Sequence, residues 1–272
     1  MIKFKYLILI SLLVLCLPLI SACTSKQALK IEVNGDAISD YKTSTDDRFI
    51  STSSVTSTIS VKDHPIKATT TEKVTVLIPT SFELRVAFAQ QAPFANWDEL
   101  HEESCEEASM IMAAKYFHKE NLDETIMEQE IQGLIGWQKE RSFGVDLTAE
   151  ETQIILKEYF GLNAKLTTDV SVDRIKYELS KGNLIIVPAA GRELGNPNFK
   201  QPGPIYHMLV IKGYSGSQFI TNDPGTRKGN GWRYDFEKLI NSVHDWNHQL
   251  AEGGMTDQEM ALGQRIMIIV SK

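Results

Sequence analysis

The sequence is poor in cysteine and has no cluster of basic residues. Its 272 residues include 3 cysteines, with 28 Lys and Arg against 35 Asp and Glu, and the net charge is −7. A nucleic-acid-binding protein needs a basic face for the phosphates, so this balance argues against a nucleic-acid partner. The histidines also lack the spacing to carboxylates or thiols that metal sites use. We therefore expect no metal and no other cofactor.

An apolar run at residues 7–20 is too short for a typical membrane span. Lys3 and Lys5 precede it, and Ile20-Ser21-Ala22-Cys23 ends it. This pattern predicts a lipoprotein signal peptide over residues 1–22, with lipid attached to Cys23. The alternative is an uncleaved N-terminal anchor. In both cases we expect an exported protein held on the outer face of a bacterial membrane. In the first case two acyl chains would anchor it firmly.

Residues 23–73 are rich in Ser and Thr and have few apolar residues. Such a composition buries too little apolar surface to offset the entropy of ordering. We therefore predict a flexible tether over residues 23–73 and one folded, monomeric domain over residues 74–272.

Within that domain, the hydrophobic period changes from helical to strand-like along the chain. The sequence Thr148-Ala149-Glu150-Glu151 is a capping box, which marks the start of one helix. We expect helices at residues 103–119, 123–138, 148–159, 171–180 and 236–243, extended segments at 74–78 and 82–88, and strands at 184–189, 206–214, 218–222 and 265–271. This order predicts an α+β domain, with N-terminal helices packed on a mostly antiparallel sheet.

Cys105 is the one thiol that remains if Cys16 leaves with the signal and Cys23 carries lipid. It lies in the first turn of a predicted helix, after Ser104 as candidate N-cap, where the helix end favours a thiolate. Glutamates at 102, 103, 106 and 107 oppose a second negative charge. Cys105 is therefore either a nucleophile with a cationic partner or an ordinary buried cysteine.

His207 opens an apolar strand and is a candidate for that partner. If the following hairpin is symmetric about Ser215, residues whose numbers sum to 430 face each other, and His207 then pairs with Asp223. Directly opposed residues share one face of the sheet, so the carboxylate can orient the imidazole while Asn222 points away. This spacing predicts Cys105 as nucleophile, His207 as base and Asp223 as orienting residue. The oxyanion of such a reaction needs a donor, for which Gln90, Gln91 and Asn96 are equal candidates by spacing.

The chain resembles the peptidase family C39-like domains, which are relatives of the cysteine peptidases that remove double-glycine leaders and which belong to the papain-like group. The resemblance rests on residues 86–97, on Cys105-Glu106-Glu107-Ala108-Ser109, on residues 207–214 and on Asn222-Asp223-Pro224-Gly225. It spans residues 86–239 and implies a papain-like fold. It also implies that Cys105 is the nucleophile, His207 the base, Asp223 the orienting residue and Gln91 the oxyanion donor.

We expect from this a cysteine peptidase that hydrolyses a peptide or related amide bond, with a peptide or protein as substrate. Two alternatives stay open. The same residues can transfer the acyl group to an amine, or the domain is a degenerate papain-like binding module, which the acidic residues around Cys105 favour.

Overall fold

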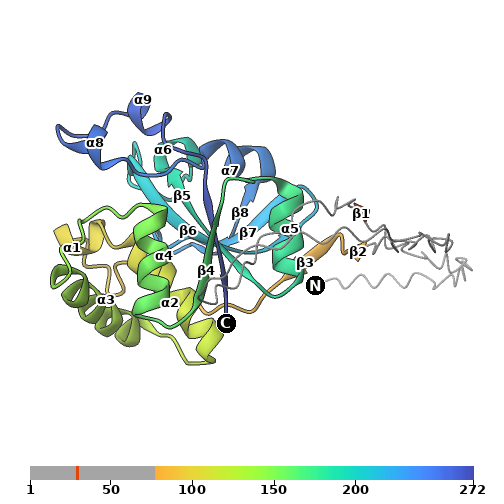
Figure 1. Cartoon of the computed structure of the whole chain (residues 1–272), viewed down its shortest axis with the longest axis horizontal. Coiled ribbons are helices and arrows are strands. Elements are labelled where there is room, and N and C mark those ends of the chain that lie inside the picture. The colour runs from red at the N-terminus through yellow and green to blue at the C-terminus, as the bar shows by residue number, and fades with distance from the viewer. Residues whose placement is uncertain (1–28, 31–76) are drawn as a thin grey trace, which may run out of the picture.

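The computed structural model describes residues 29–30 and 77–272. The elements in chain order are β1 (Leu29–Lys30), β2 (Leu77–Ile78), β3 (Ser81–Glu83), α1 (Glu99–Glu102), α2 (Cys105–His118), α3 (Glu124–Lys139), α4 (Ala149–Glu158), β4 (Asn163–Thr167), α5 (Val172–Ser180), β5 (Leu184–Ala190), α6 (Gly191–Leu194), β6 (Tyr206–Ser215), β7 (Gln218–Asn222), β8 (Asn230–Asp235), α7 (Phe236–Ser242), α8 (His248–Ala251), α9 (Asp257–Met260) and β9 (Met267–Ser271). Helices α1 to α4 gather at one end of the domain (Figure 1). The fold class is α+β, with helices packed on an antiparallel sheet, as the sequence predicts.

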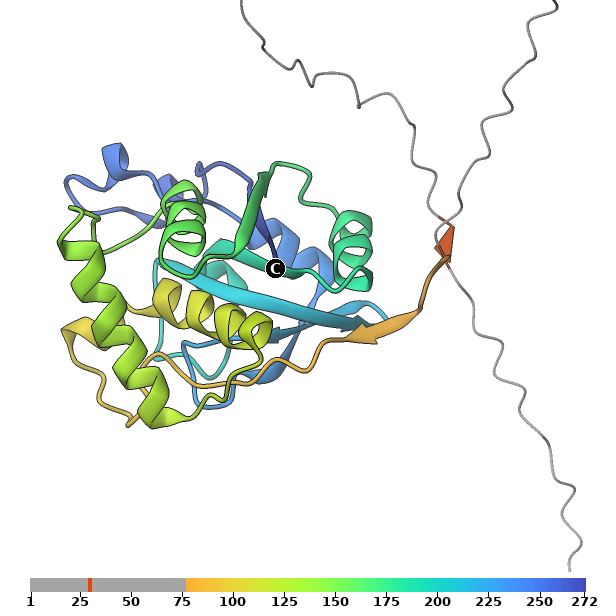
Figure 2. The same cartoon turned by 60° about the horizontal axis from the view of Figure 1, so that its bottom comes forward.

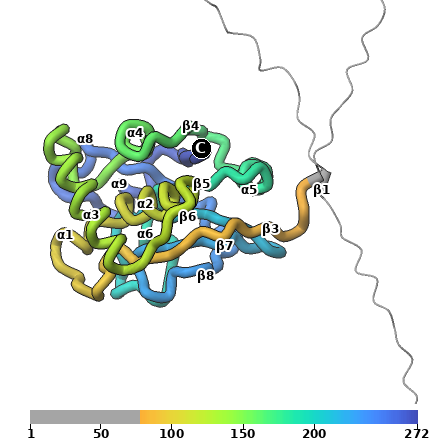
Figure 3. The backbone as a smooth tube through the Cα atoms, turned by 90° about the horizontal axis from the view of Figure 1, so that it is seen from below, coloured from red at the N-terminus to blue at the C-terminus, as the bar shows by residue number. Residues whose placement is uncertain are grey.

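The main sheet has seven strands, six of them in the order β4-β9-β5-β6-β7-β8, and every neighbouring pair is antiparallel. Figure 3 shows β4, β5, β6, β7 and β8 following one another across the domain. The seventh strand, β3, pairs with the far end of β6 at Ser81↔Ser215. Strands β4 and β8, the two edges of this sheet, were not predicted from the sequence.

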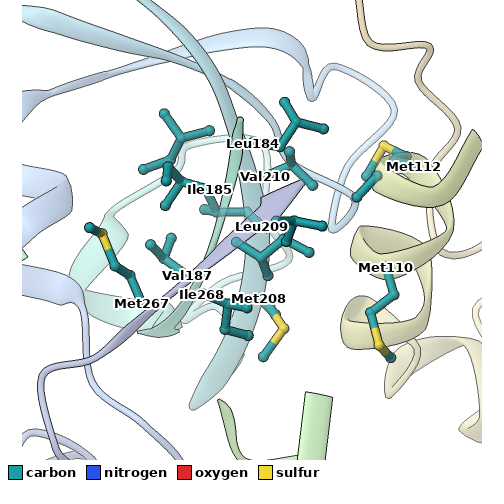
Figure 4. Packing of buried hydrophobic residues seen from close by; sticks show 14 of the residues in the cluster. Met110, Met112, Leu184, Ile185, Val187, Met208, Leu209, Val210, Met267 and Ile268 are labelled. Atoms are coloured by element: carbon teal, nitrogen blue, oxygen red, sulfur yellow. The ribbon is translucent and has the colours of Figure 1, made fainter. Parts of the chain in front are cut away.

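Strand β6 is the centre of the domain, and both of its faces are covered. All residues of β5 are buried, and so are those of β6 up to Tyr214. Continuous burial of this kind is typical of strands with packed elements on both sides. Helix α2 contacts β5 and β6 (Figure 2), and its Met110 and Met112 lie beside the apolar side chains of these strands (Figure 4).

Short polar caps begin three of the long helices at the predicted places. The side chains of Asp123, Thr148 and Ser171 accept hydrogen bonds from backbone amides in the first turns of α3, α4 and α5. Thr148 and Glu151 form the predicted capping box, in which each side chain bonds the backbone of the other. These caps satisfy amides that a helix leaves without intrahelical partners.

The register predicted for the β6–β7 hairpin is wrong. Its residues Ser215 and Gln218 pair directly, so the turn is at Gly216 and Ser217 instead of Ser215. A bulge between Ile211 and Gly213 then places Ile211 opposite Thr221. At this end of the hairpin, facing residue numbers therefore sum to 432 (211 and 221) and not to 430. Because the side-chain period of a strand is 2, this displacement by two residues preserves the predicted parity of the facing residues. The pairs next to the turn, whose numbers sum to 433, are displaced by three and do not preserve it.

The predicted signal peptide, residues 1–22, lies outside the described residues, as does the predicted tether apart from β1. The two residues of β1 pair with β2 through Leu29↔Ile78 and Lys30↔Leu77. Within residues 29–30 and 77–272, no helix has the length and apolar character needed to cross a membrane.

Candidate active site

Cys105 is the first residue of α2 and is 6% exposed. The sequence predicts a helix from residue 103, but the chain forms the short helix α1 and turns before α2 begins. Ser104 precedes α2 without capping it, because its hydroxyl donates instead to the carbonyl of Leu100 at 2.6 Å. The thiol therefore lies in the first turn of a fourteen-residue helix, where the helix end favours negative charge.

The start of α2 lies beside β6 at the point where β7 separates from it. The last pair between the two strands is Val210↔Asn222, so the backbone of Met208 is free to bond other partners on that side. The Ser109 hydroxyl donates to the carbonyl of Met208 at 3.1 Å. The backbone of Met208 also acts on Cys105, where it lowers the pKa of the thiol against the stronger effect of burial. The start of α2 is therefore fixed beside the residue that follows His207.

His207 and Asp223 bond each other deep in the domain. His207 Nε2 lies 2.8 Å from Asp223 Oδ1, and the two residues are 1% and 0% exposed. Asp223 follows the end of β7, so it approaches the imidazole from the loop between β7 and β8 and is not directly paired with a residue of β6. With Nε2 bonded to the carboxylate, Nδ1 is the nitrogen left to exchange a proton with a thiol.

The Asp223 carboxylate has four hydrogen-bond donors. The Gly225 amide donates to Oδ1 at 3.1 Å, beside the bond from His207. Tyr234 Oη and Asn196 Nδ2 donate to Oδ2 at 2.6 and 2.9 Å. Burial alone would raise the pKa of Asp223, but the charge of His207 and these bonds together lower it. The carboxylate is thus kept ionised, although it is buried.

Asn196 and Tyr234 were not predicted as site residues. Asn196 lies in the loop after α6, and Tyr234 lies in β8, a strand that the sequence analysis did not find. The one signal for Asn196 in the sequence is its place as a polar residue between Gly195 and Pro197.

Cys105 and His207 face one cleft of about 1080 Å³. Its walls include Trp97 and Trp246, and residues 197–204 form a continuous part of the lining. Phe199 from this loop meets the ring of His207 edge-on, with ring centres 5.1 Å apart. The loop before His207 therefore borders the cleft.

Gln91 also lines the cleft, but both of its amide hydrogens are engaged. Its Nε2 donates to the carbonyls of His101 and Glu102, each at 2.9 Å. Its Oε1 is buried, with no hydrogen-bond partner among the described residues. The amide of Asn96 contacts the His101 ring at 3.0 Å, and that of Gln90 donates weakly to Pro93 at 3.4 Å. In this arrangement Gln91 must release one carbonyl before it can donate to an oxyanion.

The thiol of Cys105 donates to Oε2 of Glu106 at 2.9 Å, and the described residues show no hydrogen bond from it to His207. Burial raises the pKa of the Cys105 thiol well above its ordinary value, and the charge of Glu106 raises it further. The Met208 backbone acts in the opposite direction. Across residues 29–30 and 77–272, no group of three or more His, Cys, Asp or Glu side chains could hold a metal ion.

Comparison with known proteins identifies the family. The model of the Peptidase C39-like family matches residues 83–251, which is more than half of the chain. No curated protein has a significantly similar sequence. Among solved structures, a provisionally assigned C39-like peptidase from Bacillus anthracis is 15% identical, with a TM-score of 0.46, and the match covers 71% of this chain and 98% of that one. On the family match, the chain belongs to the Peptidase C39-like family.

Proposed function

We propose that the protein is a cysteine peptidase that hydrolyses a peptide or related amide bond through Cys105, His207 and Asp223. The observation that carries the proposal is the buried His207–Asp223 pair, joined at 2.8 Å, in the same cleft as a thiol at a helix N-terminus. Membership of a peptidase family supports the same reaction class.

In the proposed reaction, Nδ1 of His207 takes the thiol proton and the thiolate attacks the carbonyl carbon of the substrate. The imidazolium then gives this proton to the leaving amine, which departs and leaves an acyl group on the sulfur. Water, deprotonated by the same imidazole, hydrolyses the thioester and restores the thiol. Asp223 fixes the tautomer of His207 and stabilises its cationic form.

Digestion of a peptide library tests this function. The full-length protein, in detergent and a reducing agent, should cleave a subset of peptides that mass spectrometry can identify. The Cys105→Ala variant should cleave none, although it unfolds at nearly the same temperature. Equal cleavage by both proteins would show that the activity does not come from Cys105.

A second function, a binding module without catalysis, is favoured by two observations at the site. The sulfur contacts Glu106, and Gln91 uses both amide hydrogens on backbone carbonyls. The two functions differ in the reactivity of the thiol. A nucleophile is alkylated rapidly by iodoacetamide at neutral pH, whereas an inert buried thiol is not.

We also propose that the protein acts outside the cytoplasm, held on a bacterial membrane by lipid on Cys23. This rests on the basic start, the apolar run at residues 7–20 and the ending Ile20-Ser21-Ala22-Cys23. A Ser/Thr-rich segment between lipid and domain would let the cleft reach peptides at a distance from the membrane.

A further inference from the structure

Two buried glutamates follow the proposed nucleophile directly. Glu106 is 0% exposed and Glu107 is 2% exposed. Neither forms an ion pair with a cation in the described part of the chain; their hydrogen bonds come from a thiol, a backbone amide and a side-chain amide. Buried carboxylates without a counter-charge are costly, so their presence beside Cys105 calls for a physical account.

The two side chains have different surroundings. Glu106 Oε1 accepts the amide of Leu147 at 3.0 Å, and Oε2 contacts the Cys105 sulfur at 2.9 Å. Glu107 turns away and accepts the amide of Gln138 at 2.7 Å, while its Oε2 is buried with no hydrogen-bond partner among the described residues. Only Glu106 is therefore in a position to influence the nucleophile by contact.

The charged and titratable groups around Glu106 are mostly acidic. Glu107 and Cys105 lie on the same helix, and Asp146 lies just before Leu147. Tyr206 of β6 faces the same region, where its hydroxyl donates to the carbonyl of Leu147. Asp245 adds another acidic group near Tyr206. A negative charge on Glu106 would thus meet like charges on several sides and no cation within bonding distance.

The carboxyl of Glu106 is therefore best accommodated as a neutral acid. Burial, and then the charge of Glu107, raise the pKa of Glu106 well above its ordinary value. Burial likewise raises the pKa of Glu107 to about 7. With a proton on Oε2, Glu106 can donate the hydrogen bond across the same contact of 2.9 Å, because the Cys105 sulfur can act as acceptor.

We propose that Glu106 is a positioning residue for the nucleophile: its neutral carboxyl donates a hydrogen bond to the Cys105 sulfur and stabilises the thiolate when His207 removes the thiol proton. The inference rests on the proposed function. In this step the thiol proton moves from Sγ to Nδ1 of His207, Glu106 keeps its own proton, and no heavy-atom bond is made or broken. Hydrogen bonds to a charged acceptor are the stronger kind, so the donor favours the charged form of the sulfur.

Three variants of the full-length protein test this role through the thiol itself. Glu106→Gln keeps a donor of the same length and cannot ionise. Glu106→Met keeps the length but has no donor. Glu107→Met is the matched control, since it removes the neighbouring buried carboxyl that does not contact the sulfur. The rate of iodoacetamide alkylation at Cys105 is measured at pH 6, and the modified peptide is quantified by mass spectrometry so that Cys16 and Cys23 do not contribute.

A neutral donor predicts that Glu106→Gln reacts within about threefold of the wild type, whereas Glu106→Met reacts about tenfold or more slowly. Glu107→Met should stay within about threefold. If Glu106 is instead an ionised acceptor, removing its charge favours the thiolate, so Glu106→Gln would react at least about tenfold faster, and this would overturn the inference. If Glu106→Met does not fold, Glu106→Gln alone still shows whether Glu106 speeds or slows the alkylation of Cys105.

The pH profile adds a readout that a structural role would not change. Ionisation of Glu106 as the pH is raised would remove the donor and place a negative charge beside the sulfur. The alkylation rate of the wild type should therefore fall relative to that of Glu106→Gln as the pH rises; superimposable profiles would contradict the inference. A wild-type thiol that reacts no faster than one in the unfolded chain would overturn the proposed peptidase instead.

Discussion

Replacement of Glu107 by Gln should change how the stability of the domain depends on pH. The pKa of Glu107 is raised by burial from 4.5 to about 7, so between these values the folded protein holds a proton that the unfolded chain releases. The stabilisation from this proton is complete below pH 4.5 and is lost as pH rises through about 7. At about 1.4 kcal/mol per pH unit, the interval contributes at most about 3 kcal/mol.

The variant removes this dependence because an amide does not titrate, while its oxygen can still accept the bond from Gln138. Asp146 and Asp245, each with a pKa raised by burial to about 6, give the wild type and the variant the same additional slope. Relative to the wild type, Glu107→Gln should therefore gain up to about 3 kcal/mol in unfolding free energy between pH 5 and pH 8. The charge of Glu107 also raises the pKa of Glu106, so the difference between the two proteins contains the contribution of Glu107 together with its effect on Glu106.

Urea unfolding followed by tryptophan fluorescence, at pH 5 and at pH 8, measures this difference. Glu178 is the matched control, since it is also buried but lies 2.8 Å from Arg174. Its replacement by Gln should destabilise the domain at both pH values, because it leaves a cation without its partner. If Glu107→Gln were destabilising by the same amount at pH 5 and pH 8, the assignment of a raised pKa to Glu107 would be refuted.

Three further predictions concern the site and the anchor. Asp223→Asn should lower kcat by about 10² or more with little change in KM, because the tautomer of His207 is no longer fixed. The Asn222 amide bonds the carbonyls of Val86 and Ala87, so Asn222→Ala should instead lower Tm with a much smaller effect on kcat. Equal losses of kcat in the two variants would contradict the role assigned to Asp223. Gly225→Ala should lower kcat at least about tenfold, because its Cβ would lie 2.9 Å from both His207 Cε1 and Phe199 Cε1. Overpacking of this kind costs about 1–3 kcal/mol. An unchanged kcat would show that the two rings can move apart without loss of activity. Metabolic labelling with a fatty acid should mark the wild type and not Cys23→Ser, and equal labelling of both would exclude the lipid anchor.

The sequence predicts the five longer helices and the buried strands well because their signals are local, whereas the four-residue helices α1, α6, α8 and α9 were not predicted. The capping box at Thr148 and the apolar run of β6 each lie within one short window of sequence. The two strands of the main sheet that the sequence did not predict, β4 and β8, are its edges. Their sequences, Asn163–Thr167 and Asn230–Asp235, are largely polar, as suits exposed edges. Each strand has only two alternating apolar residues, Ala164 and Leu166 in β4 and Trp232 and Tyr234 in β8, which is too short a pattern to mark a strand.

The site was predicted less completely, for reasons that are not local. The pairing of β6 and β7 depends on a bulge near Gly213, where an added Cβ would lie 2.5 Å from the carbonyl of Phe82. That contact involves β3, far away in the chain. The partners of Gln91 lie in α1, and those of the Asp223 carboxylate include Asn196 after α6 and Tyr234 in β8, so spacing along the sequence gives no access to them.

The pH dependence of thiol alkylation tests whether His207 activates Cys105. Iodoacetamide rates at Cys105 are measured from pH 5 to pH 10 in the wild type and in His207→Gln. An active pair predicts rapid alkylation of the wild type below pH 7, where an isolated thiol is protonated, and a loss of about tenfold or more in this range for His207→Gln. Identical profiles for the two proteins, with alkylation rising only at alkaline pH, would contradict this activation.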